Sequence, residues 1–421
     1  MNKAIISSGL LLLVVLLVLV LVIGCVPEEV APPEEKVIKI GNLCDLTGPY
    51  STIGVPIMYG HNAYFNYIND TEGGINGIPV EVMWGDCKSN AALAISLYRR
   101  FKEAGIVAMI STTSTEVTAT LGMLDRDRIP CCGTSTSVGL VVPPRAYYNT
   151  YEGAMALQYA TQMQWYYGEW QKKGLDRPMR IGIITWDNPL GRDGWEGVKR
   201  WVERQPAGTV EIVAETFTSP LTMDYTTELT VLKAKEVDVI VNSVSGGAHG
   251  MVNRDAARVG LSEDIPIINQ AAVHTVGNIE LAAGEVGRGM TASLIYYPWE
   301  ATPGTILVEE MMARYHPGMT LTLEHYATVR NSMTLAEVIR IALDRVGYEN
   351  LTGQAIMDGF DSIKDFDNMR IGCPQTFGEY PGDRIGMTAT RIIGWDADKS
   401  RPKILTDWIP MVTLRELGYF E

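Results

Sequence analysis

The chain has 421 residues and a net charge of −14, with acidic and basic residues interleaved along its length. Nucleic-acid binding is excluded, because it needs clustered Lys and Arg side chains that displace counterions from phosphate. Apolar residues make up 46% and charged residues 20% of the chain, which predicts large buried cores. This length is too great for one ordinary core, so we expect two lobes.

The first 24 residues have the three parts of an export signal. Lys3 supplies a positive charge, an unbroken apolar run covers 10–23, and the small residue Gly24 precedes the expected cleavage site. The apolar run is shorter than the roughly 18 to 20 residues that cross a bilayer as a helix. We therefore predict a signal peptide at 1–24; an uncleaved anchor that also uses 4–9 is the alternative.

The signal ends on VIGC at 22–25, which resembles a bacterial lipobox. This resemblance implies that the chain is cut before Cys25 and that the thiol of Cys25 carries a diacylglycerol. The residues from Val26 to Lys36 include three prolines and four glutamates, which make a stiff and soluble spacer. We expect a membrane-anchored lipoprotein with a lipidated tether at 25–36, facing the periplasm or the cell exterior.

The next part of the chain alternates short apolar strands with helices. A strand at 37–43 is followed by a helical pattern at 54–69, and the turn GGINGIP at 73–79 leads into the next strand. Further strands are expected at 80–84, 106–110 and 129–132, with helices at 91–102 and 116–124. The pattern is that of repeated βαβ units.

A second series follows a junction near Thr150 and a helix through Trp165. We expect strands at 179–186, 210–215, 237–243 and 265–269, with helices at 191–204, 225–234 and 248–259. From Gly289 the pattern predicts a strand, helices at 303–314, 324–346 and 353–359, and paired strands near 386–394 and 402–408. These late elements must rejoin the earlier lobes.

Strands that alternate with roughly 12-residue helices require parallel sheets with right-handed crossovers. Continuous apolar strands such as VDVIV fit burial on both faces of a sheet. The predicted fold class is therefore α/β, with two doubly wound parallel-sheet lobes. Ligands of such sheets bind beyond the carboxyl ends of the strands, so residues that directly follow strands are the first candidates for a site.

Five cysteines remain after Cys25, and they form no C-x-x-C unit, which argues against a zinc site. Cys44 and Cys87 follow the first two predicted strands, so they are candidates for a disulfide if those strands are neighbours. Cys131 and Cys132 are adjacent, and two small buried residues explain them better than a strained vicinal disulfide. We expect no metal and no cofactor.

Five motifs occur in the order typical of one family. They are GNLCDLTGPYSTIG at 41–54, INDTEGGINGIPVEVMWGD at 68–86, ISTTSTEV at 110–117, CCGTSTS at 131–137 and ITWDNPLGRDG at 184–194. Over about 37–410 the chain thereby resembles the type I periplasmic binding proteins of the branched-chain amino-acid importers. The resemblance implies a small-molecule ligand bound between two lobes that are joined by three hinge crossings.

By this resemblance, lobe one would hold 37–149 and 295–381, and lobe two would hold 150–294 and 382–421. The implied partners are an ABC permease and its ATPase, with the membrane reached through lipid on Cys25. A sensory protein that reports the solute to a receptor partner would use the same cleft and remains an alternative.

The family binds a ligand carboxylate with hydroxyls and backbone N–H groups at helix starts of lobe one. The matching positions are Ser114, Thr115, Thr134, Ser135 and Thr136. Hydroxyls beside the free N–H groups at the positive end of a helix dipole bind an anion without a lysine. Ordinary helix capping is the alternative role for such residues.

The chain departs from the family where the ligand's ammonium is usually bound. Leu190 stands where tyrosine is common, and Gln270 lies near the expected acidic residue. An unpaired ammonium in a closed cleft would cost several kcal/mol, so we expect a small carboxylate, an amide or an aromatic acid in preference to leucine. Tyr50, Trp186 and Asn188 complete the expected ligand-binding set, although aromatic residues at strand ends often belong to the core.

An enzyme is the main rival from another class. The sequence has no G-x-S-x-G, G-x-x-x-x-G-K-[ST] or H-E-x-x-H motif. A G-x-G-x-x-A match at 287–292 leads into a predicted strand and not out of one, which is the wrong context for a dinucleotide. Nothing in the sequence brings a histidine near Cys131 or Cys132, so a cysteine-dependent hydrolase is only a further alternative. We predict a binding protein and no enzyme.

Overall fold

The computed structural model describes residues 35–420, except 136, 143–144, 246, 262–264, 271–289, 295–298, 380–383 and 397–400. The predicted signal peptide, Cys25 and most of the tether therefore lie outside the described residues. Among the described residues, no helix is both long enough and apolar enough to cross a membrane.

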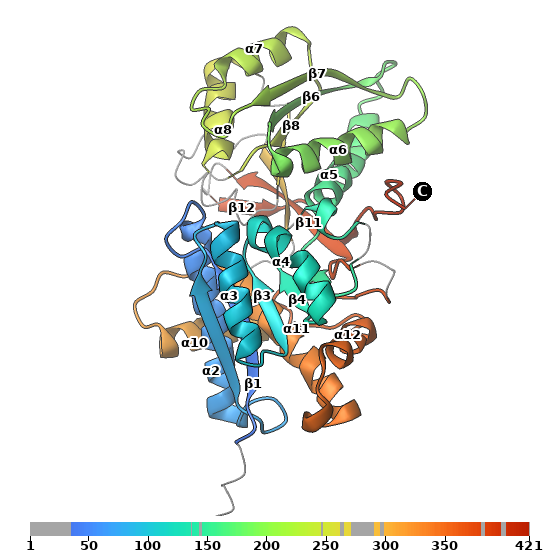
Figure 1. Cartoon of the computed structure of the whole chain (residues 1–421). Helices are drawn as coiled ribbons and strands as arrows, with labels where there is room; N and C mark the ends of the chain where they lie inside the picture. The colour runs from blue at the N-terminus through green and yellow to red at the C-terminus, as the bar shows by residue number, and fades with distance from the viewer. Residues whose placement is uncertain are drawn as a thin grey trace, which may run out of the picture. The chain divides into compact units, whose positions relative to one another are not determined.

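The first sheet is parallel and has the strand order β2-β1-β3-β4-β5 (Figure 1). Its strands are β1 (Ile38–Cys44), β2 (Val80–Asp86), β3 (Ala108–Ser111), β4 (Cys131–Gly133) and β5 (Tyr148–Thr150). β1 is buried along nearly its whole length, as expected for a strand covered on both faces. The first four strands lie within a few residues of their predicted positions, whereas β5 was not predicted.

Helices from two parts of the chain cover this sheet. α2 (Ser51–Glu72), α3 (Ala91–Glu103) and α4 (Ser114–Asp127) connect its strands, and the short 3-10 helix η1 (Val138–Leu140) lies between β4 and β5. The later helices are α10 (Pro303–Tyr315), α11 (Leu323–Val346) and α12 (Gly353–Ser362), with the 3-10 helix η3 (Tyr348–Asn350). α10 and α11 contact α2, and α12 contacts α11, so the chain returns to the first sheet after its second series of strands.

The second sheet is mixed and has the order β12-β11-β10-β9-β8-β6-β7, with β13 paired to β11. Its parallel strands are β6 (Met179–Trp186), β7 (Val210–Thr218), β8 (Val239–Ser243), β9 (Ile267–Asn269) and β10 (Met290–Leu294). β11 (Ala389–Asp396) pairs antiparallel with β10, β12 (Arg401–Ile404) and β13 (Ile409–Pro410). The predicted α/β fold with two doubly wound sheets is confirmed, and the late paired strands add an antiparallel edge to the second sheet.

Four helices accompany the second sheet: α5 (Met155–Gln171), α6 (Pro189–Glu203), α7 (Thr226–Ala234) and α8 (Ala248–Arg258). α5 packs along α6 and also contacts β9 and β10, so it is buried on nearly all sides. The described chain passes between the two sheets after β5, after β10 and before β11. These are the three crossings that the sequence resemblance implies.

The expected disulfide between Cys44 and Cys87 is not formed. β1 and β2 are neighbours, as that prediction required, and Cys44 lies opposite Asp86. The five cysteines of the described residues are nevertheless all free thiols. The Cys44 thiol donates to Oδ1 of Asn42 (3.2 Å), and the Cys87 thiol donates to Oε1 of Glu116 (2.8 Å). Each sulfur is therefore directed at an oxygen acceptor and not at the other sulfur.

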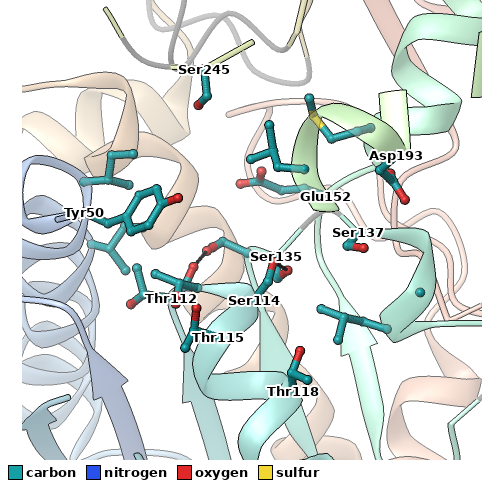
Figure 2. Close-up of a pocket in the computed structure, with 18 of the residues that line it drawn as sticks. Tyr50, Thr112, Ser114, Thr115, Thr118, Ser135, Ser137, Glu152, Asp193 and Ser245 are labelled. Atoms are coloured by element: carbon teal, nitrogen blue, oxygen red, sulfur yellow. Dashed lines mark hydrogen bonds between the residues drawn. The ribbon is translucent and has the colours of Figure 1, made fainter. Parts of the chain in front are cut away.

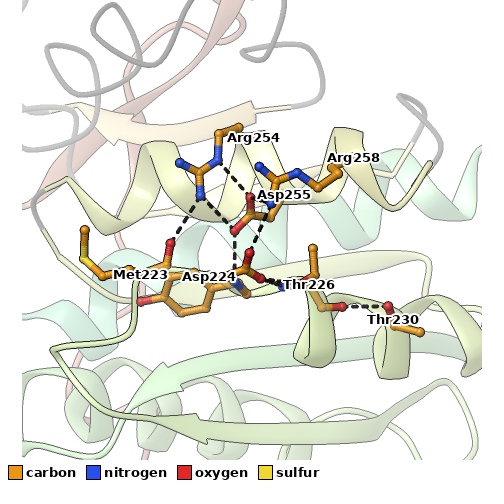
Figure 3. A network of polar contacts seen from close by, with 8 residues as sticks. Met223, Asp224, Thr226, Thr230, Arg254, Asp255 and Arg258 are labelled. Atoms are coloured by element: carbon orange, nitrogen blue, oxygen red, sulfur yellow. Dashed lines mark hydrogen bonds and ion pairs between the residues drawn. The ribbon is translucent and has the colours of Figure 1, made fainter.

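A buried carboxylate joins α7 to α8 (Figure 3). Asp255 on α8 is fully buried and accepts the backbone N–H of Tyr225, which precedes α7, at 2.9 Å. Its oxygens also accept hydrogen bonds from Arg254 at 2.8 and 3.1 Å, and Arg258 lies 3.3 Å from one of them. Arg258 pairs with Asp224 as well, at 3.1 Å. This network fixes the two helices to each other.

We predict that Asp255→Ala lowers the free energy of unfolding by about 2 to 4 kcal/mol. The substitution removes several charge-assisted hydrogen bonds and leaves the buried N–H of Tyr225 without its acceptor. Urea unfolding followed by circular dichroism measures the change. Asp70→Ala is the matched control, because it removes an exposed ion pair with Arg314 and should cost less than about 1 kcal/mol. Equal losses in the two variants would contradict the prediction.

Candidate functional site

A cavity of about 800 Å³ lies at the carboxyl ends of strands from both sheets (Figure 2). Its lining includes residues that follow β3, β4 and β5 in the first sheet and β6, β8 and β9 in the second. The polar lining residues include Tyr50, Thr112, Ser114, Thr115, Thr134, Ser135, Ser137, Arg145, Glu152, Gln158, Asn188, Asp193, Ser245, Gln270, Glu324 and Thr328. This is where the strand polarity of a doubly wound sheet places a ligand.

Most of the predicted ligand-binding residues line this cavity. They are Tyr50, Ser114, Thr115, Thr134, Ser135, Asn188 and Gln270. Thr136 lies outside the described residues. Trp186 is not among the lining residues; its Nε1 donates to the hydroxyl of Tyr225 at 3.1 Å, beside the core under α7 and α8. Ligand binding by any of these residues remains a prediction.

Two hydroxyl-bearing loops meet because they follow adjacent strands. β3 and β4 are parallel neighbours, with Ser111 opposite Gly133. The hydroxyls of Ser114 and Ser135 hydrogen-bond to each other across the two loops (Figure 2). The Thr134 hydroxyl donates to the carbonyl oxygen of residue 112 at 2.9 Å, which adds a second link between the loops. The result is a cluster of hydroxyls in the lining.

A buried carboxylate holds the first of these loops in place. Glu116 lies in the first turn of α4 and is 0% exposed. It accepts hydrogen bonds from the Ser111 hydroxyl (3.0 Å), the Cys87 thiol (2.8 Å), and the backbone N–H groups of Thr112 (3.1 Å) and Thr113. Burial raises the pKa of Glu116, against the lowering effect of these donors. The loop conformation therefore depends on this one side chain.

The N-terminus of α4 reaches the cavity at Ser114 and Thr115. Thr113 is the N-cap residue, so ordinary capping does not account for the hydroxyls of Ser114 and Thr115. The first N–H groups of a helix have no partner within the helix. Those of Ser114 and Thr115 therefore lie beside the serine hydroxyls, where the positive end of the helix dipole favours an anion.

Asn188 and Gln270 bring the second sheet to the same cavity. Asn188 follows β6 and caps α6, since its Oδ1 accepts the N–H of Gly191 at 2.9 Å. Gln270 follows β9, is 1% exposed, and donates from Nε2 to the Ser245 hydroxyl at 3.3 Å. Both side chains thus have a structural role as well as a place in the lining.

Glu152 is a buried acid that the sequence analysis did not single out. It follows β5, is 9% exposed, and its carboxylate points into the cavity (Figure 2). The carboxylate has no hydrogen-bond partner among the described residues. Burial raises the pKa of Glu152 to about 7, with Arg330 lowering it and Glu324 raising it. Burial also raises the pKa of Glu324, which lines the cavity from the first turn of α11.

Asp193 is a further acid of the lining that was not expected. It lies on α6, and its oxygens accept the N–H groups of Val138 (2.9 Å) and Ala156 (3.2 Å). Burial raises the pKa of Asp193 to about 7, although these two donors oppose the shift. In the described ranges, no group of three or more His, Cys, Asp or Glu side chains is arranged to hold a metal ion.

Comparison of the sequence with protein-family models identifies the family of this protein. A family model described as periplasmic binding protein matches residues 37–400. The chain belongs to the periplasmic binding protein family. A comparison with curated proteins finds no matching sequence.

Solved structures of ABC transporter proteins and of a leucine binding protein share the fold of this chain. A branched-chain amino-acid ABC transporter protein from Thermus thermophilus with bound valine is 18% identical, with a TM-score of 0.78 over 91% of this chain and 99% of that chain. A fatty acid ABC transporter substrate-binding protein from Thermomonospora curvata is 18% identical, with a TM-score of 0.74 over 90% and 93%. A leucine binding protein from Thermotoga maritima is 17% identical, with a TM-score of 0.69 over 89% and 99%. The predicted type I fold is thereby confirmed.

We predict that Glu116→Ala lowers the free energy of unfolding of this periplasmic binding protein by at least about 2 kcal/mol. The substitution leaves the Ser111 hydroxyl and the N–H of Thr113 without an acceptor, and each unsatisfied buried group costs about 1 to 3 kcal/mol. The N–H of Thr112 and the Cys87 thiol lose one of their two acceptors. Urea unfolding measures the loss. Glu103→Ala on the exposed surface of α3 serves as the control and should change stability by less than about 0.5 kcal/mol. A similar result for both variants would refute the role given to Glu116.

Proposed function

We propose that this periplasmic binding protein is the solute-binding component of an ABC importer and that it binds a small solute through a carboxylate. The observation that carries the proposal is the Ser114–Ser135 hydroxyl pair at the N-terminus of α4, in a cavity lined by both sheets. Hydroxyl and backbone donors at a helix start stabilise a carboxylate. Two of the similar structures belong to an amino-acid and a fatty-acid ABC transporter, and both kinds of solute carry a carboxylate.

The proposed mechanism is hinge closure. The solute binds first to the hydroxyls of lobe one, which we assign to 37–149 and 295–381. Lobe two, at 150–294 and 382–421, then closes over it and brings Asn188 and Gln270 toward the solute. Only contacts that are stronger in the closed form shift the equilibrium toward it. An ABC permease with its ATPase would recognise the closed form.

The N-terminal segment of the proposed binding protein would direct its export and carry its lipid anchor. The N-terminal sequence supports a cleaved signal at 1–24, a diacylglycerol on Cys25 and a tether at 25–36. A lipid on one residue would keep the binding protein at the membrane surface, close to its permease.

Glu152 favours an amino-acid-like solute over an amide or an aromatic acid. Gln270 stands where the family's acidic residue is expected, which leaves a ligand ammonium without a counter-ion at that position. Glu152 offers a buried carboxylate in the same cavity without a hydrogen-bond partner among the described residues. A bound ammonium would pair with it and offset the cost of burying both charges.

Replacing Ser114 and Ser135 together by Ala is expected to weaken binding of a carboxylate ligand at least about tenfold. Each hydrogen bond to a charged group contributes about 1.5 to 3 kcal/mol. A thermal-shift screen with L-valine, L-valinamide, benzoate and octanoate selects the ligand, since a solute that binds only the native state raises its Tm. Calorimetry then measures the affinity, with Ser96→Ala on the exposed face of α3 as control. An unchanged affinity would remove the two serines from the site.

The direction of the pH dependence should report the charge of the ligand. Because the pKa of Glu152 is raised to about 7, its carboxylate must lose a proton before it can pair with a ligand ammonium. Affinity for an amino acid should then fall by up to about tenfold per pH unit below 7 and stay constant well above it. A ligand without a cation should show the opposite trend, because protonation removes an unfavourable charge. Calorimetry from about pH 5.5 to 8.5 separates the two cases.

Two variants assign this pH dependence to its residue. Glu152→Gln should flatten the pH profile, because the neutral side chain no longer titrates. Asp193 has a pKa in the same range, so Asp193→Asn is measured beside it and should keep most of the slope. If the affinity still depends on pH in Glu152→Gln but no longer does so in Asp193→Asn, the role given to Glu152 is contradicted.

A further inference from the structure

Arg145 is a cation of the cavity lining that has no hydrogen-bond or ion-pair partner among the described residues. Arg145 lies on the loop between η1 and β5, and its Nε is buried without a hydrogen-bond partner. It forms no ion pair with any described residue. None of the three acids of the lining, Glu152, Asp193 and Glu324, forms an ion pair with Arg145 in the described part of the chain. A guanidinium held partly out of water costs free energy unless an anion compensates its charge.

The cavity continues from the serine pair along one face of α4. Ser114, Thr118 and Leu121 all line it, and their spacing of four and seven residues places them on one helix face. Seven residues of α-helix span about 10 Å. Figure 2 shows Thr118 on the far side of Ser114 from Glu152. The groove therefore leads away from the acid and along the helix.

The other wall of this groove is η1, which contacts α4 and contributes Gly139 and Leu140 to the lining. Leu121 and Leu140 make the middle of the groove apolar. Both walls belong to the chain segment between β3 and β5, so hinge closure moves them together. The same cavity thus holds the hydroxyl of Ser114, the cationic side chain of Arg145, which follows η1 in the chain, and the apolar side chains of Leu121 and Leu140.

We propose that the solute carries a second anionic group, which binds Arg145, and that an apolar chain separates it from the carboxylate at Ser114. The inference rests on the proposed function and adds the class of solute, an elongated molecule with an acid at each end. Along α4 the lining extends about 10 Å from Ser114 to Leu121, a length that an extended chain of about eight bonds covers at roughly 1.2 Å per bond. Dicarboxylates of about six to nine carbons match this length and are the first probes.

The test compares each dicarboxylate with the monocarboxylate of equal chain length. The probes are adipate and hexanoate, pimelate and heptanoate, suberate and octanoate, and azelate and nonanoate, measured by calorimetry. At one chain length or more the dicarboxylate should bind at least about tenfold more tightly, as expected for a charge-assisted pair with arginine. Arg145→Gln should bring this ratio close to one. Arg99→Gln, on the exposed surface of α3, should leave it unchanged.

A steric variant tests the groove independently of charge. A Cβ on Gly139 would meet only the Ser137 hydroxyl, at 3.7 Å, so Gly139→Phe fits the backbone and fills the groove. It should weaken binding of the preferred dicarboxylate at least about tenfold, with little change in Tm. Loss of the dicarboxylate preference in Arg145→Gln, together with weaker dicarboxylate binding in Gly139→Phe, supports the inference.

The outcomes separate this inference from the proposed function. A ratio near one in the wild-type protein, or a preference that survives Arg145→Gln, overturns the second anion site. Monocarboxylate binding that the Ser114 and Ser135 substitutions weaken would still support the proposed function in that case. If the wild-type protein binds none of these probes and also none of L-valine, benzoate and octanoate, the proposed function fails and this inference fails with it.

Discussion

Parallel pairing of strands determines where the site lies. In a parallel sheet every strand ends at the same edge, so residues far apart in the sequence meet there. The loops after β3 and β4 supply the hydroxyls of Ser114 and Ser135, and the residue after β9 is Gln270. No single segment of this periplasmic binding protein contains the site. The cavity is a product of strand direction in both sheets.

Glu116 shows how a buried charge shapes a site that it does not line. Its carboxylate accepts hydrogen bonds from the N–H groups of Thr112 and Thr113, from the Ser111 hydroxyl and from the Cys87 thiol. The helix therefore presents to the cavity only the N–H groups that come after its cap. Burying a carboxylate costs free energy, and these four donors offset part of that cost. The loop is rigid because its alternatives would leave several polar groups unpaired.

The sequence was sufficient for the fold and for placing Ser114 and Ser135 after neighbouring strands, because apolar strands and helical periodicity are local patterns. β5 was not predicted, because its sequence Tyr-Asn-Thr is short and lacks an apolar run. Glu152 directly follows β5, so it was not recognised as a residue at a strand end. Strand adjacency correctly placed Cys44 near Cys87, but it carries no information on where each sulfur points. Trp186 likewise lies at a strand end, yet its indole is turned toward Tyr225. Side-chain direction is set by tertiary packing.

Asp193 accepts hydrogen bonds from the start of η1 and from the start of α5, while it belongs to α6. One carboxylate is therefore common to a wall of the groove and to two helices of the second sheet. In the proposed hinge closure, occupancy of the groove and the relative position of the sheets would therefore be coupled. Because such coupling is reciprocal, a solute that steadies η1 would favour one position of the sheets, and that position would in return change how firmly the solute is retained.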